Sequence, residues 1–137
     1  MLHPEILSVL GGAGHGSKIL IADGNYPFAT RVHPNARRVY LNLAPGLVSV
    51  TDVLRVLVTA IPIEAVHVML TDSGEAPPIH NEFRIILPPE LNLQPLNRHA
   101  FYDAVRLDPD TALVIATGEQ RIFANIILTI GVVHPPV

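Results

Sequence analysis

The stretch "GGAGHGSKILIADGNYP", residues 11–27, decides how the chain begins to fold. Four glycines surround one histidine, His15, and the apolar run behind them is long enough for one buried strand. The residues before it, from Pro4 onward, carry an apolar stripe at helical spacing, and the first glycines end that helix. Turn residues follow at 23–25. The stretch therefore predicts a helix, a tight glycine turn and a buried strand over Ile19–Ala22.

The glycine run does not match a phosphate-binding loop. A P-loop places a lysine directly after a glycine and a hydroxyl residue after the lysine, whereas the order here is Gly16-Ser17-Lys18. A dinucleotide-binding fingerprint would need a further glycine at position 17 or 19, where the chain has serine and isoleucine. Both motifs also follow a strand and precede a helix, which is the reverse of this order. What remains is a tight turn that carries His15, either as a functional imidazole or as a surface histidine.

Asp23 lies just beyond the strand that His15 precedes. A four-residue strand spans about 13 Å, so a direct contact within one subunit requires the chain to fold back on itself. The turns on both sides of the strand permit this without requiring it. The alternative is that the two side chains belong to one pocket and bind different parts of a ligand.

Composition limits the class of protein. The 137 residues predict a single domain, 1–137, and only 15% of them are charged while 49% are hydrophobic, which favours a surface partly buried in a homo-oligomer. A net charge of −3 disfavours nucleic acid as a partner. The chain has no cysteine, no apolar run of membrane-spanning length and no secretion signal, so we expect no disulfide, no membrane partner and a cytoplasmic location.

The rest of the chain alternates helical and strand patterns, which predicts an α/β fold. Ser49 or Thr51 is expected to cap the clearest helix, which Pro62 stops. Residues 80–87 are ambiguous and favour a helix that starts near Asn81, behind a loop over 73–83. The other expected elements are strands at 37–43, 65–71, 112–119 and 124–133 and a short amphipathic helix at 97–107.

The other histidines are poorer functional candidates. His33 and His80 lie in loop-like stretches, and His67 lies within an expected strand as a candidate core residue. No pair has the spacing typical of a metal site, so we expect neither a metal nor another cofactor.

Three segments resemble one known family. "GHGSKILIADGNYP" (14–27) is similar to the opening signature of the D-ribose pyranase and L-fucose mutarotase family, and "ATGEQRIFANIILTIGVV" (116–133) is similar to its closing signature. "NRHAFYDAV" (97–105) looks like the fucose branch, in which an arginine precedes Phe-Tyr. The resemblance covers both ends of the chain well and the middle loosely. It implies a three-layer α/β/α domain around a mixed sheet, assembled into rings or decamers.

The resemblance also implies roles for particular residues. His15 matches the catalytic histidine, the proton donor, and Asp23 matches a carboxylate that binds sugar hydroxyls. Arg98 matches a sugar-binding arginine, and the segment Phe123, Ala124 and Asn125 matches one that binds sugar from the adjacent subunit. Phe123 stands where the family usually has tyrosine, so one hydroxyl is lost. Residues 41–47 also depart from the fucose branch.

These matches predict a monosaccharide mutarotase or pyranase that acts on a fucose-like or ribose-like sugar by general acid–base catalysis. Tyr102 and Glu119 are second-rank candidates. Tyr102 is equally well explained as a half-buried helix aromatic, and the alternative for Glu119 is a structural hydrogen bond in its turn. The alternative function is a non-catalytic monosaccharide-binding or transport-accessory protein, which the missing tyrosine hydroxyl motivates. A metal-dependent hydrolase built on scattered histidines is a third possibility.

Overall fold

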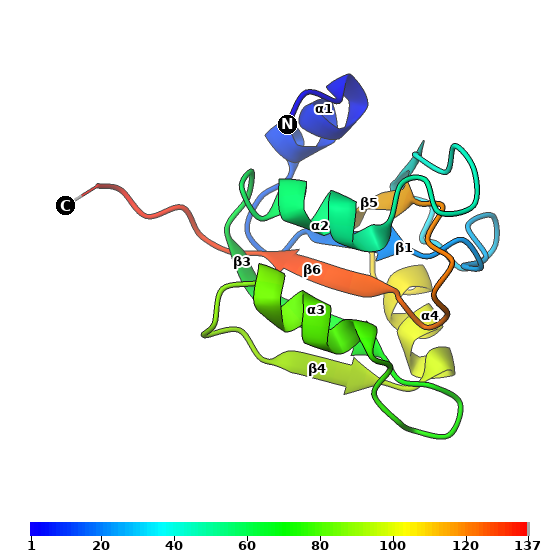
Figure 1. Cartoon of the computed structure of the whole chain (residues 1–137). Helices are drawn as coiled ribbons and strands as arrows, with labels where there is room; N and C mark the ends of the chain where they lie inside the picture. The colour runs from blue at the N-terminus through cyan, green and yellow to red at the C-terminus, as the bar shows by residue number, and fades with distance from the viewer. Residues whose placement is uncertain (137) are drawn as a thin grey trace.

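The computed structural model describes residues 1–136 as a mixed sheet with helices on both faces (Figure 1). The helices are α1 (Pro4–Gly12), α2 (Val50–Leu57), α3 (Ile79–Ile86) and α4 (Arg98–Arg106). The strands are β1 (Lys18–Ala22), β2 (Arg37–Tyr40), β3 (Ile63–Met69), β4 (Leu93–Leu96), β5 (Thr111–Ala116) and β6 (Ile126–Ile130). No helix within residues 1–136 is long and apolar enough to cross a bilayer.

The sheet has the order β2-β5-β1-β6-β3-β4. β1 is parallel to β5, β5 is parallel to β2, and β3 is parallel to β4. β6 is antiparallel to both of its neighbours, β1 and β3. The first and last strands of the chain are therefore hydrogen-bonded partners in the middle of the sheet, where both faces are covered.

Alternation along β1 divides the core into two layers. Ile19 and Ile21 point into a cluster formed with α1, α2 and α3, whereas Leu20 and Ala22 point into a second cluster with α4 and the 26–36 loop. Figure 1 shows α2 and α3 on one side of the strands and α4 on the other. The predicted three-layer α/β/α domain is thus confirmed.

Local signals explain where the helices begin. Ser49 and Asp52 form a reciprocal capping box at the start of α2, as the capping prediction required. The Asn97 side chain caps α4 by accepting a hydrogen bond from the Ala100 N–H at 2.8 Å. The helix favoured over 80–87 is confirmed as α3. The loop expected over 73–83 is therefore wrong from Ile79 onward, because the apolar face of α3 packs into the core.

β4 was not predicted from the sequence. Its residues, "LQPL", include Pro95, which cannot donate to a strand ladder and normally argues against a strand. β4 pairs with β3 alone at one edge of the sheet, where a proline is tolerated because the outer side needs no donor.

Gly118 is required where β5 leaves the sheet. A Cβ atom at this position would lie 2.2 Å from the Ala44 carbonyl oxygen and 2.4 Å from that of Leu47. The Gly118 N–H also donates to the Val48 carbonyl at 2.9 Å, and its carbonyl accepts from the Gly46 N–H at 2.6 Å. The close approach holds the 44–48 turn against the end of the central strands.

We predict that Gly118→Ala lowers the free energy of unfolding by about 1–3 kcal/mol. The new Cβ atom would clash with backbone carbonyl oxygens, and the backbone must shift to make room because no flexible side chain can move aside. Gly12→Ala, at the end of α1, is the control, since a Cβ there meets nothing within 4 Å. Urea denaturation of both variants measures the difference. Equal midpoints would contradict the packing argument.

Candidate functional site

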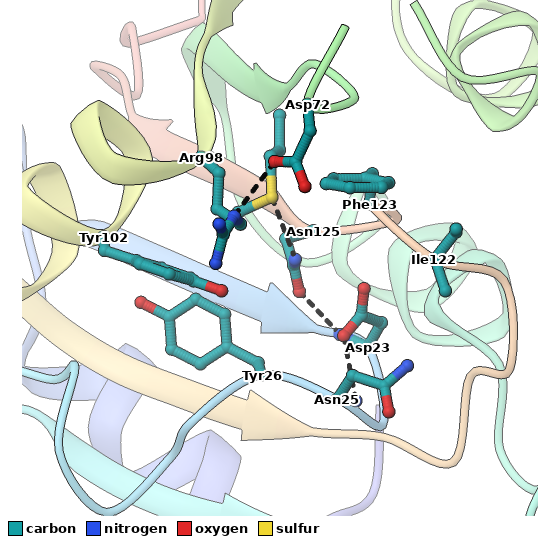
Figure 2. Close-up of a pocket in the computed structure, with 10 residues that line it drawn as sticks. Asp23, Asn25, Tyr26, Asp72, Arg98, Tyr102, Ile122, Phe123 and Asn125 are labelled. Atoms are coloured by element: carbon teal, nitrogen blue, oxygen red, sulfur yellow. Dashed lines mark hydrogen bonds and ion pairs between the residues drawn. The ribbon is translucent and has the colours of Figure 1, made fainter.

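A cavity of about 310 Å³ opens where β1 and β3 end, beside the start of α4 and the turn before β6 (Figure 2). Its lining residues are Asp23, Asn25, Tyr26, Met69, Asp72, Arg98, Tyr102, Ile122, Phe123 and Asn125. Of the predicted site residues, Asp23, Arg98, Tyr102, Phe123 and Asn125 meet here. Polar side chains make up most of the lining, and Met69, Ile122 and Phe123 add apolar surface.

Asp23 is the buried carboxylate of the cavity, with 2% of the residue exposed. Its Oδ1 accepts from the Asn25 N–H at 3.0 Å, and its Oδ2 accepts from the Ala124 N–H at 3.2 Å. Burial raises the pKa of the Asp23 carboxyl above its ordinary value, and these N–H donors partly offset the rise. A buried acid with a perturbed pKa in a cavity is a common feature of functional sites.

The 123–125 segment completes the cavity of its own chain. The Asp23 N–H donates to the Asn125 side-chain oxygen at 2.7 Å, and the Asn125 amide nitrogen lies 3.7 Å from the Met69 sulfur. The segment therefore contacts Asp23 of its own chain. That it binds the sugar of an adjacent subunit, as the resemblance implied, stays a prediction. Because β6 begins at Ile126 and runs antiparallel to β1, the residues before it fall at the end of β1.

Arg98 is the first residue of α4 and extends toward the cavity. Its Nε donates to Asp72 Oδ1 at 3.0 Å, and its guanidinium carbon lies 5.9 Å from the Tyr102 ring centroid. Tyr102 packs edge-on against Tyr26 at 5.4 Å between ring centroids. The Tyr26 hydroxyl donates to the Arg31 carbonyl at 2.7 Å, which fixes this aromatic wall.

Phe123 presents its ring to the cavity from a left-handed backbone, with φ of 59°. A bulky residue in this region is strained by about 1–3 kcal/mol, and such conformations concentrate at binding and catalytic sites. The hydrogen bonds of Ala124 and Asn125 to Asp23 hold the chain in place directly behind it.

His15 does not line this cavity. It precedes β1, whereas Asp23 follows it, and five residues of strand separate the two ends by roughly 16 Å. The His15 Nε2 instead lies 2.8 Å from Glu64 Oε2, and both side chains are substantially exposed, at 59% and 44%. The sequence left open either a direct contact between His15 and Asp23 within one subunit or a pocket to which both side chains belong. The structure excludes the direct contact within one chain.

Glu119 also lies outside the cavity. Its Oε1 accepts from the Val50 N–H at the start of α2, at 3.2 Å, and from Arg121 Nη2 at 2.8 Å. Burial alone raises the pKa of Glu119, but the hydrogen bonds and charge of Arg121 outweigh it and hold the pKa below its usual value. This geometry supports the structural interpretation of Glu119 rather than contact with a ligand.

Sequence reasoning missed several residues of the site. Asp72, Asn25, Tyr26, Met69 and Ile122 line the cavity, and Glu64 pairs with His15. Asn25 and Tyr26 follow Asp23 closely in the quoted stretch, so their closeness in sequence to a predicted site residue could have identified them as part of the site. Asp72 and Glu64 lie in the loosely matched middle of the chain, where no signal marks them.

The remaining histidines form no metal centre. Within residues 1–136, no group of three or more histidine, cysteine, aspartate or glutamate residues could hold an ion. His80 lies in α3 rather than in a loop, and its buried ring stacks on Phe83 at 6.0 Å. His67 lies in β3 as expected and is half-buried.

A three-layer α/β domain with a carboxylate, a guanidinium and an amide around one open cavity belongs to the class of α/β proteins that bind a small polar molecule at the ends of their strands. The chain belongs to the RbsD / FucU transport protein family, whose family model matches residues 1–133. The resemblance seen in the sequence is thereby confirmed.

Two sequence relatives whose names describe an enzyme activity align with almost the whole chain. A D-ribose pyranase of Variovorax paradoxus (strain S110) is 30% identical over 96% of this chain and 95% of that protein. A fucose mutarotase of Danio rerio is 29% identical over 98% of this chain and 92% of that protein.

Solved structures of two proteins with similar names share the fold of this chain. Bacillus subtilis RbsD complexed with D-ribose is similar with a TM-score of 0.84 and 27% identity, over 98% of this chain and 96% of that one. Fucose mutarotase in complex with L-fucose from Streptococcus pneumoniae is similar with a TM-score of 0.81 and 26% identity, over 97% and 95%.

We predict that Glu119→Gln destabilises the protein by about 1–3 kcal/mol at pH 7, because a neutral amide replaces the acceptor of two charged hydrogen bonds. The folded-state pKa lies below the unfolded value of 4.5, so this stability is present above that pH and is lost as the pH falls through the folded-state pKa. Unfolding curves of wild type and variant should therefore converge in acid. Exposed Glu90→Gln is the control, and a constant gap at all pH values would contradict the assignment.

Proposed function

We propose that this protein is a monosaccharide mutarotase, which interconverts the anomers or ring forms of a fucose-like or ribose-like sugar by general acid–base catalysis. The observation that carries the proposal is the cavity at the end of β1. It sets a buried carboxylate, a guanidinium and a side-chain amide beside apolar surface. A sugar ring offers the matching pattern of hydroxyls and C–H faces. The names of the relatives, D-ribose pyranase and fucose mutarotase, support the same reaction class.

In this proposal Asp23, Arg98 and Asn125 hold sugar hydroxyls. The carboxylate accepts hydrogen bonds, the guanidinium donates them, and the amide can do either. The Ala124 N–H holds Asp23 in its binding position. The Phe123 ring packs against the C–H face of the sugar without donating a hydroxyl bond.

His15 is the proposed proton-transfer group. His15 gives a proton to the ring oxygen while a second group, acting as base, takes the proton from the anomeric hydroxyl, and the bond from the ring oxygen to the anomeric carbon breaks. Rotation about one bond and the reverse step then close the ring. Glu64 Oε2 lies 2.8 Å from His15 Nε2 and accepts a hydrogen bond from the imidazole, which orients the ring as a partner carboxylate does for a histidine base.

If His15 acts on a sugar bound in this cavity, a second chain must supply it. The cavity and the imidazole lie at opposite ends of β1, so a neighbour that supplies His15 must pack one end of its fold against the other end of this one. Such a heterologous contact closes into a ring when the rotation allows it. Tyr40, Leu43, Leu47 and Ile122 are exposed apolar side chains available for this contact. The homo-oligomeric ring, its decameric count and the cytoplasmic location stay proposals.

A non-catalytic sugar-binding protein is the second candidate. Phe123 lacks the hydroxyl that the family's tyrosine would bring, and the cavity of a single chain contains no histidine. Saturable sugar binding without accelerated anomer exchange would select this function.

We predict that wild-type protein accelerates exchange between the anomeric protons of L-fucose or D-ribose in saturation-transfer NMR. His15→Ala should lose about 10²–10⁴-fold of that acceleration, because it removes the proton-transfer group. The control is His67→Ala, whose ring lies on β3 away from the cavity. Unchanged exchange by His15→Ala would remove His15 from the mechanism.

We further predict complementation between subunits. If His15 and Asp23 of one site come from different chains, a 1:1 co-assembled mixture of His15→Ala and Asp23→Asn should regain about one quarter of wild-type exchange. Random assembly gives a site an intact His15 in half of cases and, independently, an intact Asp23 in half of cases. A mixture of Asp23→Asn with Asn125→Ala is the control and should regain none, because these residues belong to one chain's cavity. Equal failure of both mixtures would contradict the shared site.

A further inference from the structure

We infer that Asp72 is a positioning residue for Arg98, holding the guanidinium where it can bind a sugar hydroxyl. The inference rests on the proposed function and names a residue that neither the motifs nor the family resemblance singled out. Figure 2 shows the Arg98 side chain between the Asp72 carboxylate and the Tyr102 ring.

The backbone of Asp72 is held in a tight turn. The Gly74 N–H donates to the Thr71 carbonyl at 2.9 Å, and the Thr71 N–H donates to the Glu75 carbonyl at 2.9 Å. The Glu75 N–H also donates to the Thr71 hydroxyl at 3.1 Å. The carboxylate therefore projects from a turn that is closed by its own hydrogen bonds, and its side chain is 66% exposed at the cavity mouth.

Sheet pairing sets the spacing between the two residues. Met69 and Leu96 are register partners in the parallel pair β3 and β4, and the Leu70 N–H donates to the Leu96 carbonyl at 2.9 Å. Both chains then leave the sheet on the same side. Asp72 follows Met69 by a short turn, and Arg98 begins α4 just after Leu96, so the two side chains meet beyond the strand ends.

Arg98 occupies a position where a cation is normally disfavoured. The N-terminus of a helix carries a partial positive charge, and α4 has no acidic residue in its first turn. Asp72 supplies the missing negative charge from another segment, at 3.0 Å from Nε. The bond uses the inner nitrogen of the guanidinium, so the terminal nitrogens are directed away from Asp72, on the side of Tyr102 and the cavity.

The contact orients the donor rather than joining the reaction. Without the carboxylate, the long arginine side chain would sample other rotamers, and part of the binding free energy would be spent on ordering it. Because Arg98 binds a hydroxyl in both the ground state and the transition state, the effect should fall on KM and leave kcat nearly unchanged.

The experiment is a double-mutant cycle on sugar exchange and sugar binding with L-fucose and D-ribose as probes. Asp72→Asn should raise KM and Kd by about 1.4- to 5-fold, the range for an exposed ion pair, with kcat within about twofold of wild type. Asp72→Glu should restore most of the loss. In an Arg98→Ala background, Asp72→Asn should have no further effect, since its partner is gone.

The matched control is Asp103→Asn, which breaks the 2.9 Å ion pair with Arg106 farther along α4 and changes the net charge by the same amount. Unfolding curves of each variant separate a purely structural role, which would destabilise Asp72→Asn in both backgrounds and leave KM unchanged. That outcome, or equal KM values for Asp72→Asn and Asp103→Asn, would overturn the inference. A wild-type protein that neither exchanges nor binds these sugars would instead overturn the proposed function, and this inference with it.

Discussion

The antiparallel pairing of β6 with β1 is the constraint on which the rest of the structure depends. It is the contact that brings the two ends of the chain together in the middle of the sheet, with Ile21 opposite Ile126. Because the partners run in opposite directions, the end of β1 and the approach to β6 fall at the same edge. The Asp23 N–H then meets the Asn125 side chain, and the Ala124 N–H meets the Asp23 carboxylate. A cavity formed from residues a hundred positions apart is thus a direct result of strand direction.

The same pairing explains how the cavity accommodates a buried carboxylate. Asp23 is buried, so each of its carboxylate oxygens needs a donor, and the backbone of the neighbouring turns provides them. The strained backbone angle of Phe123 is maintained because the hydrogen bonds of the next two residues hold the chain in this conformation. The Ala124 N–H that binds Asp23 directly follows Phe123, so one short segment holds both the carboxylate and the ring.

Much of the fold could be predicted from periodicity and capping residues, and the rest failed for identifiable reasons. The apolar run of β1 and the Ser49 cap mark their elements directly. β4 carries too little pattern around Pro95 to be recognised, since its pairing with β3 is what makes it a strand. In the site, Asp23 and Asn125 lie within recognisable signatures. Asp72 is placed by the register of β3 and β4, which no local pattern encodes. The contact of the 123–125 segment with Asp23 of its own chain depends on the antiparallel direction of β6, which the sequence did not predict.

The separation of His15 from Asp23 along β1 also bears on how such a catalyst responds to its own concentration. Under the proposed function, an isolated chain holds a binding cavity without its acid and an acid without a substrate. Turnover per chain would then fall on dilution below the point at which subunits dissociate, and sugar affinity would decline less steeply than rate. Assembly would thereby act as the on-switch of the enzyme, with the length of a single strand as its structural cause.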